Sequence, residues 1–386
     1  MNLELDRSHF LSHCWQRRPL FMPAAVPDFI APISANELAG LALDADIESR
    51  IIEQVGESWQ QSSGPFTEQD FKRSNPWTLL VQAVDHFVPE VAALKSLVSF
   101  LPSWRIDDVM VSYATDGGSV GPHFDNYDVF LLQGEGQRQW RLGQYCDSNT
   151  ALQEHSQLRL LAEFESREEY TLDPGDVLYV PPGVAHWGIA QGECTTFSLG
   201  FRAPRLNTLL SRWLDDLLAR AEPDQFYRDP DIDLATQVGE IRPADIESAR
   251  EQLLALLISD AEGDWFGEVV TEPRYPLGGD LSDGIHYDIH YGADELAAQL
   301  QRLASRDVRI SIERAAKVAW QRRGAMLSVY ANGESTSLPA EVLPLLQTLL
   351  ENSSTRGPTL GLDQGADTPE RCLLSFLLES GALNVE

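Results

Sequence analysis

Two histidines and an aspartate form the pattern in this chain that points most directly to chemistry. His123 and Asp125 stand two positions apart in Gly-Pro-His-Phe-Asp, and His186 follows the corner Pro181-Pro182-Gly183. Alternate residues of an extended segment point to the same side, so His123 and Asp125 can converge on one ion. Two imidazoles and one carboxylate are the donors that hold non-haem Fe(II) while leaving coordination positions open. The pattern therefore predicts an iron site whose open positions do the chemistry.

The third ligand needs elements of its own to bring it to the first two. Asp173-Pro-Gly-Asp176 is typical of a tight turn, Val177–Val180 of a short buried strand, and Pro181-Pro182-Gly183 of a rigid corner. A His-x-Asp pair is common by chance, and a lone histidine is more often a core or surface residue than a ligand. The combination of turn, strand and corner before His186 favours the metal site over these ordinary interpretations.

An arginine on an apolar strand face is the second clue. Arg138, Trp140 and Leu142 alternate along a predicted strand and share one face. A buried guanidinium needs an anionic partner, since leaving the charge uncompensated costs roughly several kcal/mol, and its fork fits a carboxylate. A dicarboxylate such as 2-oxoglutarate would meet this need, with Ser112 on the preceding strand as a second donor. An internal salt bridge explains Arg138 alone equally well.

Between about Trp104 and Pro204 the chain resembles a JmjC-type double-stranded β-helix oxygenase. The following motifs resemble those of the bacterial ribosomal oxygenases: Asp107-Asp108-Val-Met-Val-Ser-Tyr, Gly-Pro-His-Phe-Asp-Asn-Tyr-Asp-Val-Phe, Tyr-Val-Pro-Pro-Gly and Ser-Leu-Gly-Phe-Arg-Ala-Pro. The resemblance extends to the N-terminal motifs Trp15-Gln-Arg-Arg-Pro19 and Glu37-Leu-Ala-Gly-Leu-Ala42. It therefore covers the whole length and is specific to the family.

The resemblance implies Fe(II) as cofactor, 2-oxoglutarate and O2 as co-substrates, and hydroxylation of an arginine of the sixteenth large-subunit ribosomal protein. It makes His123, Asp125 and His186 the catalytic iron ligands, and Ser112 and Arg138 the residues that bind the distal carboxylate of 2-oxoglutarate. Candidates for recognising the substrate guanidinium are nearby polar residues: Asp116, Asn126, Tyr127 and Asp128.

Charge and composition restrict the partners. The 386 residues include 59 acidic and 29 basic side chains, a net charge of −30 that disfavours nucleic-acid phosphates and anionic lipid. A basic ribosomal protein would be steered toward such a surface, although acidity also simply increases solubility. No apolar run approaches the roughly 20 residues that span a bilayer, there is no signal-peptide pattern, and the four cysteines are scattered. We expect a cytoplasmic protein without membrane or direct nucleic-acid contact.

The predicted organisation is an α+β chain in three parts. Residues 1–205 form the double-stranded β-helix oxygenase domain, residues 206–266 a helical segment that makes a homodimer, and residues 267–386 a winged-helix-like domain. The barrel strands expected are Asp108–Ala114, Tyr127–Gln133, Gln137–Leu142, Val177–Val180 and Thr196–Phe201, with a helix-like insertion at Leu158–Glu169. The helices expected are Ala35–Ala42, Leu79–His86, Asn207–Ala221, Pro243–Ile258, Ala293–Ala304, Pro339–Asn352 and Pro369–Leu378.

Two features of the C-terminal part limit its interpretation. Glu341–Glu351 contains no Lys or Arg, so this winged-helix-like domain is expected to contact protein and not DNA. His286, Asp288 and His290 alternate as a second ligand-like cluster, but no third arm accompanies them, and we expect no metal there. Two alternatives stay open: a histidinyl hydroxylase or demethylase of another protein, and a cupin-type sensor with a winged-helix DNA-binding domain.

Overall fold

The structure is a computed structural model that describes residues 2–56, 58–154, 157–220, 226–230, 237–259, 263–274, 293–303, 308–351, 355–356 and 368–385. The described residues form two compact units, one ending at Ala203 and one beginning at Pro204, and each is treated by itself. In these ranges no helix is both long and apolar enough to cross a membrane. The second cluster, at positions 286, 288 and 290, lies outside the described residues.

An eight-stranded antiparallel sheet forms one side of the first unit, in the order β1-β9-β6-β11-β5-β4-β2-β3. Its strands are β1 (Leu20–Met22), β2 (Ser49–Val55), β3 (Ser58–Ser63), β4 (Trp77–Val81), β5 (Ile106–Ala114), β6 (Val129–Gln133), β9 (Val177–Val180) and β11 (Cys194–Phe201). Short helices cover one face: α1 (Arg7–His13), α2 (Ala35–Leu41), α3 (Val84–Phe87) and α4 (Pro89–Ala92). The largest hydrophobic core lies between them, with Phe10, Leu38 and Tyr179 fully buried.

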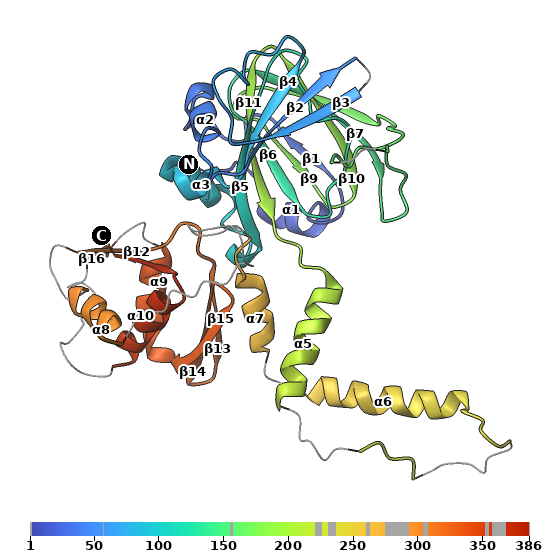
Figure 1. Ribbon diagram of the computed structural model, residues 1–386, viewed down its shortest axis with the longest axis vertical. Coiled ribbons are helices and arrows are strands. Elements are labelled where there is room, and N and C mark those ends of the chain that lie inside the picture. The colour runs from blue at the N-terminus through green and yellow to red at the C-terminus, as the bar shows by residue number, and fades with distance from the viewer. Residues whose placement is uncertain are drawn as a thin grey trace. The chain divides into compact units, whose positions relative to one another are not determined.

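A three-stranded sheet in the order β10-β7-β8 closes the other side of the barrel (Figure 1). Its strands are β7 (Gln137–Tyr145), β8 (Glu168–Leu172) and β10 (Val184–Gln191). Leu131 and Leu178 of the large sheet pack in one cluster with Trp140 and Leu142 of the small sheet. The two sheets therefore face each other. Because side chains alternate along a strand, Arg138 shares the inward face of Trp140.

The register places polar side chains on the inner face of the large sheet. Ser112 of β5 pairs with Thr196 of β11, which pairs in turn with Gln133 of β6. Cross-strand partners lie on the same face, and Gln133 shares its face with the inward Leu131. Ser112 and Thr196 are thus within the barrel, and both are buried.

Two expected helices are wrong. Residues 158–167 form no helix, and β8 begins at Glu168. Leu160 and Leu161 are buried, so their spacing reflects packing of an irregular loop and not a helical face. Leu79–His86 divides instead into the end of β4 and the short helix α3, because burial of all five residues of β4 in the sheet overrides helical spacing. Strand β10 was not expected.

The second unit combines helices with two small sheets. The helices are α5 (Leu206–Arg220), α6 (Pro243–Ser259), α7 (Asp264–Thr271), α8 (Ala293–Arg302), α9 (Leu343–Glu351) and α10 (Pro369–Glu379). The sheets are β16-β12-β17 and β13-β14-β15, built from β12 (Arg309–Ile312), β13 (Val318–Arg323), β14 (Met326–Ala331), β15 (Glu334–Pro339), β16 (Thr355–Arg356) and β17 (Leu383–Val385). Helix α7 packs on β14, where the Tyr330 hydroxyl donates to Asp264 at 2.7 Å. The expected hairpin is present between β14 and β15, and its turn contains Asn332 and Gly333, both with positive φ.

Candidate metal site

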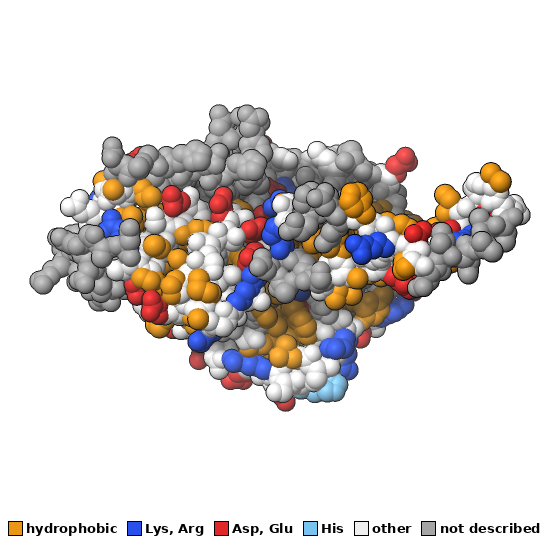
Figure 2. Space-filling model, turned by 90° about the horizontal axis from the view of Figure 1, so that it is seen from below, with side chains coloured by type: hydrophobic (Ala, Val, Ile, Leu, Met, Phe, Trp, Pro, Cys, Tyr) orange, Lys and Arg blue, Asp and Glu red, His pale blue; other side chains and the backbone are white. Residues whose placement is uncertain are grey.

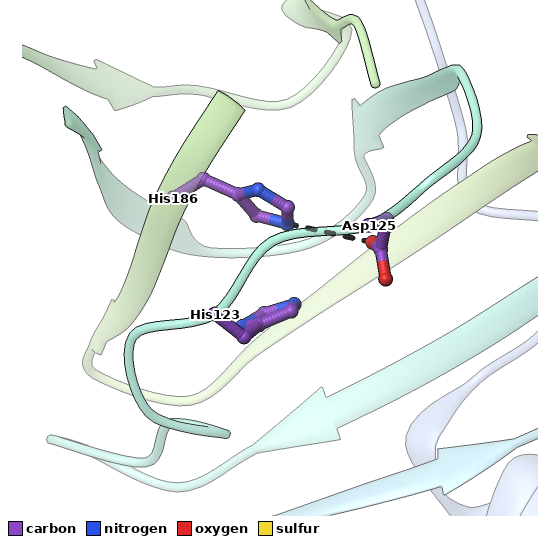
Figure 3. Close-up of side chains that lie close together, drawn as sticks. All are labelled: His123, Asp125 and His186. Atoms are coloured by element: carbon purple, nitrogen blue, oxygen red, sulfur yellow. Dashed lines mark ion pairs between the residues drawn. The ribbon is translucent and has the colours of Figure 1, made fainter. Parts of the chain in front are cut away.

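His123, Asp125 and His186 converge at the end of the barrel. One ligand atom of each lies within 4.8 Å of the other two, and Figure 3 shows the three side chains directed toward one another. Asp125 Oδ2 is 3.7 Å from His186 Nε2, and the two imidazole centroids are 4.3 Å apart. The structure therefore brings together the three side chains that the sequence selected.

Main-chain pairing holds the two ligand-bearing segments side by side. His123 N–H donates to the His186 carbonyl at 3.1 Å, and His186 N–H donates to the His123 carbonyl at 2.8 Å. The N–H of Gly183 donates to the Asp125 carbonyl at 2.8 Å. His123 belongs to this isolated bridge and not to one of the regular strands. Alternation still directs His123 and Asp125 to the same side.

Both imidazoles are fixed through their Nδ1 atoms. Nδ1 of His123 lies 2.9 Å from the Gly121 carbonyl, and Nδ1 of His186 lies 2.9 Å from the Val184 carbonyl. A carbonyl can only accept, so each Nδ1 carries the proton and each Nε2 keeps its lone pair. Metal-binding histidines are oriented in this way by their second ring nitrogen. No residue type or spacing in the sequence signals these carbonyl contacts.

The protonation state of His186 also suits a ligand. Burial, together with the neighbouring His123, lowers the pKa of His186 to about 4. The imidazole is therefore neutral at pH 7, as metal binding requires. With one carboxylate and two imidazoles, the donor set fits a divalent metal such as Fe(II).

Arg138 is buried inside the barrel, and no described residue supplies a counter-charge to it. Its side chain is 3% exposed, and Nε and Nη2 have no hydrogen-bond partner within the described part of the chain. Its Cζ atom lies 5.8 Å from the ring centre of Trp140. The described residues thus contain no salt bridge that would explain Arg138 as a purely internal ion pair. Its free donors fit the carboxylate of an acidic ligand.

Ser112 lies on the inner face of the barrel, and its hydroxyl makes only one weak hydrogen bond. The residue is 2% exposed, and its Oγ contacts the Thr196 carbonyl at 3.5 Å, the outer limit of a hydrogen bond. The neighbouring Thr196 hydroxyl instead donates to Gln133 Oε1 at 3.3 Å. The Ser112 hydroxyl can therefore rotate toward a bound acceptor at little cost.

The prediction that Asp128 recognises a substrate guanidinium is wrong. Asp128 is fully buried, and its carboxylate accepts from Tyr179, Gln16 and Arg105 at 2.6, 2.9 and 3.0 Å. It ties the N-terminal segment to the barrel. Asp116 is exposed, with one oxygen accepting from the Gly192 N–H.

Family models match the part of the chain that contains the site. A model of the JmjC domain matches residues 93–209, which include all the strands of the small sheet and the three converging side chains. A model of the AraC-like ligand binding domain matches residues 164–264, which overlap the first match over the later barrel strands.

Relatives cover nearly the whole chain. It is 35% identical over 380 residues to the ribosomal protein uL16 3-hydroxylase of Escherichia coli, covering 98% of this chain and 97% of that protein. A probable ribosomal oxygenase of Haemophilus influenzae is 34% identical over 65% of this chain and 63% of its own length. The X-ray structure of E. coli YcfD superposes with a TM-score of 0.81 at 35% identity, covering 100% of this chain and 99% of that one.

YcfD, a ribosomal oxygenase, has also been solved in complex with cobalt and 2-oxoglutarate, and that structure matches with a TM-score of 0.78 at 34% identity over 100% of this chain and 99% of that one. The JmjC-type fold predicted from the sequence is thereby confirmed for the barrel. The winged-helix and dimerisation assignments stay predictions. The agreement of sequence, fold and family model shows that this chain belongs to the JmjC-type ribosomal oxygenases.

Proposed function

We propose that this protein is an Fe(II)- and 2-oxoglutarate-dependent oxygenase that hydroxylates an arginine side chain of ribosomal protein uL16. The family gives the reaction class, since its members include a uL16 3-hydroxylase and an oxygenase solved with 2-oxoglutarate. The observation that carries the proposal for this chain is the convergence of three ligand atoms within 4.8 Å, with both histidines held in the ligand tautomer.

His123, Asp125 and His186 would hold the metal and leave coordination positions open to the reactants. When bound there, Fe(II) supplies oxidation of an unactivated C–H bond by O2, with 2-oxoglutarate converted to succinate and CO2. The protein positions the reactants and keeps water out. The apolar walls formed by Leu131, Leu178 and their neighbours serve the second purpose.

Arg138 and Ser112 would bind the distal carboxylate of 2-oxoglutarate. Two buried guanidinium nitrogens of Arg138 have no partner within the described ranges, and a carboxylate would satisfy both through the planar fork. Ser112 contributes a hydroxyl from the opposite sheet. A neutral ligand would leave the arginine charge uncompensated in a buried site, so the charge selects a diacid.

A basic ribosomal protein is the electrostatic complement of a chain with a net charge of −30. Attraction over long range raises the association rate, and it weakens as salt screens the charges. The remaining candidates for contact with the substrate arginine are the exposed Asp116 and Asn126 and the half-buried Tyr127. Direct nucleic-acid binding and a membrane location are not part of the proposal, and a cytoplasmic location follows from the substrate.

The architecture outside the barrel is also proposed. We assign residues 1–205 to the oxygenase domain, 206–266 to a helical dimerisation segment and 267–386 to a winged-helix-like domain. Helices α5 and α6 expose apolar side chains along their lengths: Leu206, Leu210, Leu214, Leu218, Ile246, Leu253, Leu254 and Ile258. Figure 2 shows hydrophobic side chains at the surface among charged ones. A homodimer would cover the leucines of these helices.

Two alternatives are distinguished by experiment. A histidyl hydroxylase or demethylase activity is named for a Dictyostelium discoideum relative that is 30% identical over 48% of this chain and 35% of its own length. A cupin-type sensor with a winged-helix DNA-binding domain would agree with the AraC-like match, but not with the near-complete coverage by oxygenases.

The deciding experiment incubates the purified protein with Fe(II), ascorbate, 2-oxoglutarate and recombinant uL16, beside a His186→Ala control. We expect uL16 to gain the mass of one oxygen atom on an arginine peptide, and the control to give no gain. Succinate formation without modified uL16 would retain the oxygenase and reject the substrate. No succinate at all would favour the sensor, which a salt-dependent DNA-binding assay would then test.

A further inference from the structure

Trp140 carries a buried hydrogen-bond donor that the assignments above leave unused. The residue is 4% exposed, and its indole Nε1 has no hydrogen-bond partner among the residues that the structure describes. Buried tryptophans usually find a partner for this group. An unpaired buried donor costs about 1–3 kcal/mol. Such a group calls for an acceptor supplied from outside the chain.

Trp140 lies between the metal ligands and the buried arginine. In the pairing of β7 with β10, His186 faces Leu142, Gly188 faces Trp140, and Ala190 faces Arg138. The centre of the Trp140 ring is 5.9 Å from that of His186, and 5.8 Å from the Cζ atom of Arg138. A molecule that extends from the metal to Arg138 therefore passes the indole ring.

The ring is held in this place by a glycine on the neighbouring strand. A Cβ atom added at Gly188 would lie 2.8 Å from two ring carbons of Trp140, so the indole packs against the bare backbone of β10. The ring also packs in the hydrophobic cluster that includes Leu131 and Leu178. Within the described residues, Nε1 makes no hydrogen bond in this packing.

Three buried N–H groups on two neighbouring inward residues of β7 thus have no acceptor among the described residues: Nε1 of Trp140, and Nε and Nη2 of Arg138. A ligand rich in acceptor oxygens would satisfy all three. We propose that the indole N–H of Trp140 donates a hydrogen bond to an oxygen of bound 2-oxoglutarate, which makes Trp140 a co-substrate-binding residue beside Arg138 and Ser112. This inference rests on the proposed function, because it presupposes that 2-oxoglutarate occupies the barrel.

The test compares 2-oxoglutarate binding to the wild-type protein and to Trp140→Phe, both loaded with Zn(II), which binds similar donors without redox chemistry. Phenylalanine keeps an aromatic ring on Gly188 but removes the N–H. We expect the Kd for 2-oxoglutarate in calorimetry to rise about tenfold, which corresponds to ~1.4 kcal/mol, and the Kd for Zn(II) to stay unchanged.

A spectroscopic measurement separates a donor from a space-filling ring. The chain has nine tryptophans, so its ¹⁵N-labelled indole resonances can be followed one by one. The resonance lost in Trp140→Phe should move downfield in the wild-type protein when 2-oxoglutarate is added. Trp187→Phe is the matched control, because the Trp187 indole already donates to Ser119 Oγ at 2.9 Å. The Kd of the Trp187→Phe variant for 2-oxoglutarate should equal that of the wild-type protein.

Each outcome decides the inference. A Kd within about twofold of wild type, an unmoved Trp140 resonance, or a loss of Zn(II) affinity in Trp140→Phe would overturn the hydrogen bond and leave the oxygenase function intact. If Trp140→Phe does not fold, the titration of the wild-type protein is sufficient. Nine indole resonances that do not move on addition of 2-oxoglutarate would by themselves overturn the proposed hydrogen bond. Absence of any 2-oxoglutarate binding to the wild-type protein would overturn both this inference and the proposed function.

Discussion

His123 and His186 exchange both backbone hydrogen bonds of an antiparallel bridge, at 3.1 and 2.8 Å, although 62 intervening residues separate them in the sequence. The centres of the two imidazole rings are 4.3 Å apart because their main chains are paired. Metal is therefore not needed to bring these two ligands together. The site is preformed by the fold of the barrel.

A preformed site predicts that loss of one ligand removes metal binding and not the fold. For His186→Ala we expect the affinity for Co(II) to fall by at least roughly 100-fold, since even residues that only orient a ligand contribute about 10–100-fold. Circular dichroism should stay unchanged. His13→Ala, which removes an exposed imidazole on α1, is the control and should bind Co(II) normally. Co(II) affinity in His186→Ala close to that of wild type would refute the assigned ligand.

The conformation of Gly183 predicts that a side chain at this position lowers the stability of the protein. Gly183 has φ of +80°, and an added Cβ would lie 2.8 Å from the Cys146 carbonyl oxygen. Gly192 has φ of +75° with open space around the same position. Gly192→Ala should lower the free energy of unfolding by about 1 kcal/mol, the cost of the left-handed conformation. Gly183→Ala should cost more, about 2–3 kcal/mol, because a backbone clash is added.

Gly183→Ala should also weaken metal binding, because the Gly183 N–H holds the carbonyl of Asp125. Urea denaturation and Co(II) titration of both variants test this. Equal stability of the two variants would show that the corner relaxes without strain.

Arg138 predicts opposite effects on stability and on binding. No described residue compensates its buried charge, so in the absence of co-substrate Arg138→Met should raise the free energy of unfolding by about 1–3 kcal/mol. The same substitution should weaken 2-oxoglutarate binding by at least roughly 30-fold, because the carboxylate loses its buried partner. Thermal denaturation with and without 2-oxoglutarate measures both. A destabilised Arg138→Met variant would mean that the guanidinium has an internal partner.

Glu53 on β2 predicts a dependence of stability on pH that is independent of the metal. Burial alone would raise the pKa of Glu53, but hydrogen bonds from Asn75 and Arg73 and the charge of Arg73 lower it below the usual 4.5. A lowered folded-state pKa stabilises the protein above pH 4.5, and this stabilisation is lost as the pH falls through the folded-state pKa. Glu53→Gln should therefore be less stable than wild type at pH 7, by about 1–2 kcal/mol, and the difference should shrink on acidification. Denaturation at pH 7 and pH 3.5 compares them; a difference independent of pH would contradict the assignment.

If the protein is a dimer, a charged residue introduced on the exposed face of α6 should change its oligomeric state. Leu253 and Leu254 are 61% and 54% exposed in the single chain. If they are covered by a second copy, Leu253→Asp should shift the protein to monomers in light scattering without lowering barrel stability, because burying the charge is costly. Glu251→Gln on the same exposed helix is the control. A monomeric wild-type protein would reject the dimer.

The three metal ligands could be predicted from the sequence because their geometry depends on short-range features. Alternation puts His123 and Asp125 on one side even though the segment is a single bridge and not a strand. Arg138 was recognisable as an anomaly, since a charge among apolar residues at strand spacing demands an explanation. Strand β9, expected at Val177–Val180, is observed with those bounds, because four buried apolar residues between turns have few alternatives.

Long-range packing explains the failures. Leu158–Glu169 has helical spacing, yet Leu160 packs with Trp59 and Leu80, residues distant in the sequence. Asp128 could not be recognised as internal, because its partner Gln16 precedes it by 112 residues. In the sequence, Trp140 has the pattern of an ordinary apolar strand residue. Its unpaired N–H becomes visible only when the neighbours of the ring are known.

The contacts that orient the ligands have a consequence for how this site tolerates change. The carbonyls of Gly121 and Val184 orient the histidines, and the N–H of Gly183 holds the Asp125 carbonyl. These groups belong to the peptide backbone: every amino acid carries the carbonyl, and every one except proline carries the N–H. Mutational drift in the flanking side chains therefore leaves the coordination geometry in place, provided that the chain keeps its path. Binding specificity can diversify around a metal centre that stays the same.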